Sequence, residues 1–228
     1  MMNILILNDC VSPDTDTFSL LRGICHGIQK SHEIEWVNIH DLNMKNCRKC
    51  FKCQPCGECV LPEDDAHEIG RKIFKTDALV IGLEFPIQNI SLQLKNLFDR
   101  CASNIAVQKM DGNITPWRKD RPVAIASLKT RSLVARIFNR MVGNDHCYLM
   151  RTLKDGGFKL ICNFGVRPNK KIIHRELLFE KAIFLGSRLF HNDICSLNFL
   201  VYMHSFYSLY QNLIRKTMAS LKTHVLEK

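Results

Sequence analysis

Short apolar runs alternate with stretches of helical spacing along most of the chain. Strands are predicted where apolar residues run together or alternate with polar ones, at 3–7, 33–39, 77–82, 122–127 and 157–166. Helices are predicted where apolar residues recur three or four positions apart, at 18–28, 64–74, 91–101, 173–189 and in parts of 133–153. The polar stretch 108–121 is expected to be a long loop. This alternation predicts an α/β fold, with a parallel sheet covered by helices on both faces and right-handed crossovers.

The length of 228 residues suits one α/β domain with an extension. We place the domain at 1–193, because the predicted strands and their helices end there. Residues 194–228 mix apolar and basic side chains and are expected to form a C-terminal helical extension, packed on the domain or on a second subunit. No apolar run reaches the roughly 18–20 residues that span a bilayer, and the first residues do not resemble a signal peptide. We therefore expect a cytoplasmic protein without a membrane anchor.

The charge is strongly basic, with 32 Lys and Arg against 22 Asp and Glu and a formal net charge of +10. The basic residues are spread along the chain without a nucleic-acid-binding motif, so a nucleic acid is not the favoured partner. Attraction to an anionic cofactor or to an acidic protein accounts for this charge at least as well. The chain also lacks the glycine fingerprints of a Rossmann dinucleotide site and of an NTPase P-loop.

The segment 44–62 is rich in cysteine. It holds five of the chain's 11 cysteines, each three residues from the next: Cys47, Cys50, Cys53, Cys56 and Cys59. In a cytoplasmic protein such a cluster indicates a metal or redox site before it indicates disulfides. Closely spaced thiolates favour an iron–sulfur cluster over structural zinc, which usually takes two knuckles separated by a longer loop. Zinc, or five free thiols, are the alternatives.

Basic side chains surround these cysteines: Lys45, Arg48, Lys49 and Lys52. A cluster held by four thiolates is a net anion, so nearby cations would stabilise its reduced form and raise its potential. A solvated basic loop is the simpler interpretation of the same residues.

Three stretches together resemble the iron–sulfur flavoproteins within the NADPH-dependent FMN reductase family. The first is the cysteine segment, where Cys47, Cys50, Cys53 and Cys59 match a C-x2-C-x2-C-x5-C pattern that a pair of aspartates follows. Cys56 falls inside the last gap as an extra thiol. The second stretch runs from Thr76 to Arg100, and five of its residues match specifically: Gln93, Leu94, Lys95, Asp99 and Arg100. The resemblance implies a flavodoxin-like, doubly wound fold for 1–193, with 44–62 as an inserted loop and a 4Fe–4S cluster on the four matching cysteines.

The third stretch, 4–17, stands where the family binds the phosphate of FMN. The resemblance implies that the hydroxyls of Ser12, Thr15 and Thr17 contact this phosphate, together with the N-terminus of the helix that Thr15 or Asp16 caps. This loop departs from the family's pattern, because it has no glycine or arginine and carries three aspartates. The resemblance also places a second loop, Phe85, Pro86, Ile87 and Gln88, beside the isoalloxazine ring, with Glu84 at the family's proline.

These residues predict an FMN-dependent oxidoreductase that transfers electrons between FMN and a 4Fe–4S cluster, linked to NAD(P)H or ferredoxin. The resemblance further implies a homo-oligomer, a dimer or a tetramer, in which the cluster of one subunit approaches the flavin of another. Two alternatives stay open. One is an FMN-only NAD(P)H reductase with a structural cysteine loop. The other is a flavodoxin-like scaffold whose zinc-filled loop binds a protein or a nucleic acid.

Overall fold

The computed structural model describes residues 1–54, 57–84, 90–109, 113–128, 145–166 and 172–190. These residues belong to one compact unit that ends at Phe190. The predicted extension at 194–228, and therefore its boundary at 193, lie outside the described residues. Within the described part of the chain, no helix is long and apolar enough to cross a membrane.

The central sheet confirms the predicted fold class. Its five strands are β1 (Asn3–Asp9), β2 (Glu33–Asn38), β3 (Ala78–Leu83), β6 (Arg121–Leu128) and β7 (Phe158–Val166). They lie in the order β2-β1-β3-β6-β7, and each neighbouring pair is parallel. This is the flavodoxin-like strand order, in which the chain reverses direction across the sheet between β1 and β3.

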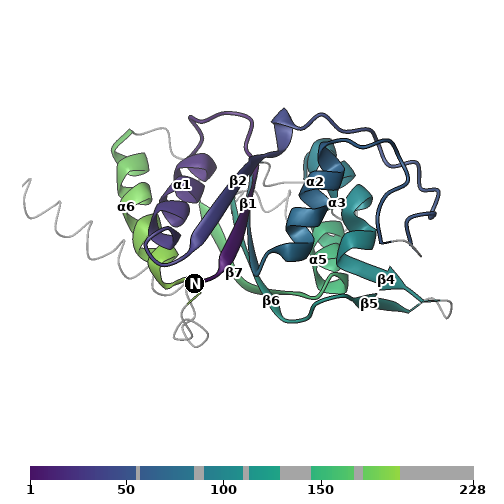
Figure 1. Cartoon of the computed structure of the whole chain (residues 1–228). Coiled ribbons are helices and arrows are strands. Elements are labelled where there is room, and N and C mark those ends of the chain that lie inside the picture. The colour runs from purple at the N-terminus through teal and green to yellow at the C-terminus, as the bar shows by residue number, and fades with distance from the viewer. Residues whose placement is uncertain (55–56, 85–89, 110–112, 129–144, 167–171, 191–228) are drawn as a thin grey trace, which may run out of the picture. The chain divides into compact units, whose positions relative to one another are not determined.

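Helices cover both faces of the sheet (Figure 1). One face carries α1 (Asp16–Ile28) and α6 (Ile172–Arg188), which pack closely against each other. The other face carries α2 (Asp65–Lys75), α3 (Leu92–Ile105) and α5 (Asp145–Asp155). Two-sided cover explains why β1 and β3 are almost entirely buried and were recognisable as apolar runs.

One expectation was wrong in part. The stretch 108–121 contains β5 (Ile114–Pro116), which pairs antiparallel with β4 (Ala106–Gln108) in a small separate sheet. Each strand has only three residues, too few for an alternating pattern to appear in the sequence. A side-chain hydrogen bond attaches this hairpin to α3: Trp117 Nε1, just after β5, donates to the carbonyl oxygen of Ser103 over 2.8 Å.

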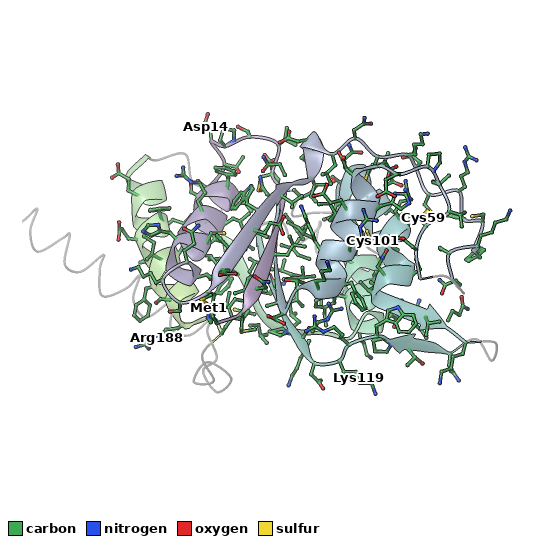
Figure 2. The ribbon with its side chains drawn as sticks, viewed as in Figure 1. Met1, Asp14, Cys59, Cys101, Lys119 and Arg188 are labelled. Carbon is green, nitrogen blue, oxygen red and sulfur yellow. The ribbon has the colours of Figure 1, made fainter. Side chains whose placement is uncertain are left out.

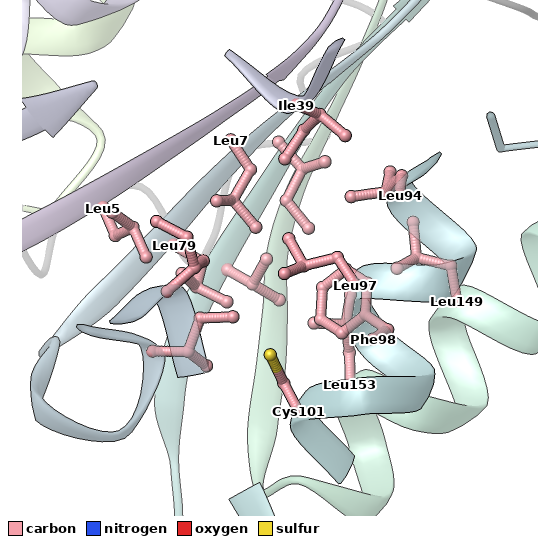
Figure 3. Packing of buried hydrophobic residues seen from close by; sticks show 14 of the residues in the cluster. Leu5, Leu7, Ile39, Leu79, Leu94, Leu97, Phe98, Cys101, Leu149 and Leu153 are labelled. Carbon is pink, nitrogen blue, oxygen red and sulfur yellow. The ribbon is translucent and has the colours of Figure 1, made fainter. Parts of the chain in front are cut away.

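Apolar side chains fill the space between the sheet and α3 and α5 (Figure 3). Leu97, Phe98 and Cys101 of α3 are fully buried there, against Leu7 and Leu79 of the sheet. Each such side chain contributes about 2 kcal/mol by leaving water. The core thus fixes α3 against the sheet, and a neighbouring side of α3 is left to hold the cysteine segment.

Candidate functional site

The loops that follow β1 and β3 leave the sheet side by side. Asp9, the last residue of β1, is in register with Leu83, the last residue of β3. Open parallel sheets bind ligands at this carboxyl edge, next to the point where the strand order reverses. The residues after β1 are those expected to bind the FMN phosphate. Of the residues expected beside the ring, Phe85, Pro86, Ile87 and Gln88 lie outside the described residues.

Thr15 and Ser12 shape the loop after β1. Thr15, rather than Asp16, is the N-cap of α1, and its Oγ1 accepts a hydrogen bond from Phe18 N over 3.1 Å. The Thr15 hydroxyl lies 3.3 Å from the carbonyl oxygen of Ser12, to which it donates. The Ser12 hydroxyl accepts from the amide of Asp14, also over 3.3 Å. The loop therefore ends on a well-formed helix N-terminus, whose dipole favours an anion.

Thr17 carries an unused polar atom in the first turn of α1. Its side chain is fully buried, and Oγ1 has no hydrogen-bond partner among the described residues. A buried hydroxyl without a partner costs about 1–3 kcal/mol. Ser12, Thr15 and Thr17 therefore gather at one loop, and this unpaired hydroxyl fits a polar group that binds there.

The carboxylate of Asp9 is bonded to α3 and not to the loop after β1. Asp9 is 1% exposed, and its carboxylate accepts from both the amide and the hydroxyl of Ser91, the N-cap of α3. Burial raises the pKa of Asp9 above its ordinary value of 3.8, and the hydrogen bonds from Ser91 and the nearby His40 offset only part of that rise. His40 Nε2 lies 3.4 Å from Asp9 Oδ1. Asp9 thus joins β1 to α3.

Glu84 makes a contact that sequence reasoning missed. Its Oε2 accepts a hydrogen bond from Val11 N over 2.5 Å, so a carboxylate from the loop after β3 occupies a backbone donor of the loop after β1. The two residues are 73 positions apart. Only the parallel pairing of β1 with β3 could have indicated that they meet.

The cysteine segment is held by polar residues of α3. Asn96 Oδ1 accepts from Cys47 N over 2.8 Å, and Asn96 Nδ2 donates to the carbonyl oxygen of Lys45 over 3.3 Å. One turn earlier, Gln93 Nε2 donates to the carbonyl oxygen of Leu42 over 3.4 Å. These bonds give the polar residues of the matching stretch a physical role: they attach an irregular loop to a rigid helix.

Arg100 is the centre of this attachment. It is only 2% exposed, and its Nε donates to Cys59 Sγ over 3.2 Å. Its terminal nitrogens lie 2.9 and 2.8 Å from the two carboxylate oxygens of Asp64, and one of them also donates to the carbonyl oxygen of Lys45 over 2.6 Å. Burial alone would raise the pKa of Asp64, but hydrogen bonds from Arg100 and from the amide of Lys45 hold it at about 2. Asp64 therefore keeps its charge and fixes the guanidinium beside the sulfur atom.

The expected ligand cysteines lie in one loop with unequal exposure. Cys47, Cys53 and Cys59 are partly buried, whereas Cys50 is exposed. Burial raises the pKa of Cys53, the Ser103 hydroxyl lowers it, and Cys59 and Cys47 raise it further, so these three thiols lie near one another. Figure 2 shows Cys59 on the same side of the domain as Cys101 of α3. Among the described residues, no three His, Cys, Asp or Glu side chains form a ready metal-binding group, and Cys56 lies outside them.

The backbone beside Cys50 is unusual. Lys49 and Phe51, on either side of it, have φ values of 51° and 57°, in the left-handed region that favours glycine. A conformation of this kind costs of order 1–3 kcal/mol and persists where something else requires it. The backbone on both sides of Cys50 therefore departs from extended geometry. In its chemistry, a set of thiols with a buried cation beside one of them, Cys59, fits an iron–sulfur cluster.

His67 was left without a role by sequence reasoning. It lies at the third position of α2, and its Nδ1 accepts from the amide of Asp64 over 3.2 Å to complete a capping box. Its Nε2 lies 2.9 Å from the carbonyl oxygen of Cys59. A polar residue three positions after Asp64 was the signal for this cap.

The sequence also matches known proteins. A family model described as NADPH-dependent FMN reductase matches residues 2–141. A relative named iron-sulfur flavoprotein, from Archaeoglobus fulgidus, is 34% identical over 101 residues, which are 43% of this chain and 48% of the relative. The match thus spans about half the length of that relative.

Two solved structures show the same fold. An FMN-dependent NADH-azoreductase from Bacillus anthracis, in complex with FMN, superposes with a TM-score of 0.63 at 16% identity, over 83% of this chain and 99% of that one. An NAD(P)H:quinone oxidoreductase from Methanothermobacter marburgensis gives 0.59 at 17% identity, over 84% and 98%.

Proposed function

The chain belongs to the NADPH-dependent FMN reductase family, and we propose that it is an FMN-dependent oxidoreductase that passes electrons between FMN and a 4Fe–4S cluster held by the segment 44–62. The observation that carries the proposal is the hydrogen bond from the buried guanidinium of Arg100 to Cys59 Sγ. A buried cation beside a thiol offsets the negative charge of a thiolate ligand. The likeness to a relative named iron-sulfur flavoprotein supports the same assignment.

Cys47, Cys50, Cys53 and Cys59 would ligate the cluster, and the bonds from α3 would fix the start and the end of their loop. At the carboxyl edge of the sheet, Ser12, Thr15 and Thr17 with the N-terminus of α1 would hold the phosphate of FMN. Residues 85–88 would border its ring. When bound, FMN exchanges one or two electrons and can take both from a hydride, whereas a 4Fe–4S cluster exchanges one at a time. The chain's own part is to hold the two groups and to keep a counter-charge beside the cluster.

The two proposed sites lie apart within one chain. Figure 2 shows Asp14, in the loop after β1, and Cys59 at well-separated places on the domain. We therefore propose a homo-oligomer, a dimer or a tetramer, in which the cluster of one subunit approaches the flavin of another. NAD(P)H or ferredoxin would supply the electrons, and the net charge of +10 suits an acidic protein donor.

The test is the visible spectrum of anaerobically purified protein before and after dithionite, together with its iron, zinc and FMN content. Flavin bands with a broad absorption near ~400 nm that bleaches on reduction are expected. Cys53→Ser should abolish that absorption, and Cys56→Ser should leave it intact. Flavin bands without iron would contradict the cluster and support an FMN-only reductase. A colourless protein with one zinc would contradict both cofactors and support the scaffold with a structural metal.

A further inference from the structure

Two backbone amides of the loop after β1 are bonded within the loop itself. The amide of Cys10 donates to Asn8 Oδ1 over 3.2 Å, and that of Asp14 donates to the Ser12 hydroxyl. Both bonds stay within the loop and hold its shape. The amide of Val11 differs, because its acceptor is Glu84, a charged group that reaches in from another loop.

Glu84 is placed there by the sheet. The register of Asp9 with Leu83 brings the next residue of each strand, Cys10 and Glu84, to the same point on the edge. Burial raises the pKa of Cys10 to about 12, and the charge of Glu84 adds to that shift. The negative charge of Glu84 is therefore felt inside the loop that would receive a phosphate.

We propose that the Glu84 carboxylate is a built-in competitor of the flavin phosphate: it accepts the hydrogen bond of the Val11 amide and must be displaced when a phosphate-bearing flavin binds. The proposal rests on the proposed function, because it concerns the same FMN site. Two anions compete for one N–H donor, and their mutual repulsion weakens binding of the second. The competition acts on the phosphate alone, so it lowers affinity for FMN and not for riboflavin, which carries the same ring without the phosphate.

The test compares the affinities of the apoprotein for FMN and for riboflavin, measured by quenching of flavin fluorescence. Glu84→Ala frees the Val11 amide and removes the charge, so FMN should bind about tenfold more tightly while riboflavin changes less than twofold. Glu84→Gln keeps an acceptor without the charge and should fall between the wild type and Glu84→Ala. Asp14→Asn is the matched control, because it removes an exposed carboxylate of the same loop that is not bonded to the Val11 amide. It should change FMN affinity less than twofold.

Equal changes for FMN and riboflavin, weaker FMN binding by Glu84→Ala, or an equal gain from Asp14→Asn would overturn the proposal. A second measurement separates it from the proposed function. Inorganic phosphate is titrated into the wild type and Glu84→Ala, and the Val11 amide is followed by NMR. Phosphate should shift this amide at about tenfold lower concentration in the variant. If neither protein binds a flavin but this difference holds, the competition is real and the FMN assignment fails; if flavins bind and the difference is absent, the competition fails.

Discussion

The guanidinium of Arg100 lies between the sulfur of Cys59, 3.2 Å from Nε, and the carboxylate of Asp64, at 2.8 and 2.9 Å. The three residues come from the middle of α3, the end of the cysteine segment and the N-cap of α2. One buried cation thus joins two helices and the loop between the sheet and α2. Asp64 balances the charge of the guanidinium through its two terminal nitrogens, and the Nε–H group bonds the sulfur of Cys59.

Arg100→Ala should destabilise the apoprotein by about 3 kcal/mol, because it leaves the largely buried carboxylate of Asp64 without its partner. It should also lower the iron content of the purified protein, since the end of the cysteine segment loses its anchor. Arg100→Lys keeps a charge but cannot reach Asp64 and Cys59 at once, so we expect it to recover stability more than iron content. Urea unfolding and metal analysis give the two readouts.

A matched control for Arg100 is Arg71, which bonds Glu58 and Glu63 at the surface near the same loop. Exposed pairs of this kind contribute little, so Arg71→Ala should change neither stability nor iron content appreciably. An equal loss from both arginines would mean that the effect is one of charge near the loop, and not of the buried contact with Cys59.

Stability in acid should depend on Asp64. Its pKa of about 2 in the folded protein lies below the ordinary value of 3.8, so the charged form favours the folded state. The contribution, about 2 kcal/mol, is fully present above about pH 5 and is lost as the pH falls through the folded pKa near 2. Asp64→Asn should therefore be less stable than the wild-type apoprotein at pH 6, and the gap should narrow by pH 2.5. A gap that stays constant in urea unfolding across this range would contradict the assignment.

The cysteines should differ strongly in how fast their thiols react with an alkylating reagent. Burial raises the pKa of Cys10, Cys25 and Cys101 to about 12, so at pH 8 almost none of each is thiolate. Cys50 is exposed and should react first with iodoacetamide in the apoprotein. Peptide mass spectrometry after timed labelling measures this order. Early labelling of Cys101 would show that α3 does not pack on the core as described.

The parts of this protein that sequence alone predicted are those with a periodic or a local signal. β1 and β3 appeared as apolar runs because helices bury both of their faces, and the half-exposed β2 appeared as an alternation. Thr15 was one of the two N-caps expected for α1. The cysteine segment was recognisable from the regular spacing of its five cysteines. What escaped depends on distant residues that the fold brings together: Arg100 with Cys59 across 41 positions, and Glu84 with Val11 across 73.

The contact of α1 with α6 makes a last prediction, which tests the fold apart from its cofactors. A Cβ added at Gly27 would lie 2.1 Å from the carbonyl oxygen of Ile183 and 2.6 Å from the amide of Ser187, both backbone atoms of α6. Alanine favours a helix over glycine by up to about 1 kcal/mol, but forcing the helices apart costs more, so Gly27→Ala should lower stability by about 1–2 kcal/mol. Arg22→Ala, on the exposed side of α1, should be close to neutral in the same thermal unfolding experiment. A Gly27→Ala variant more stable than the wild type would mean that α6 does not seat against α1 in solution.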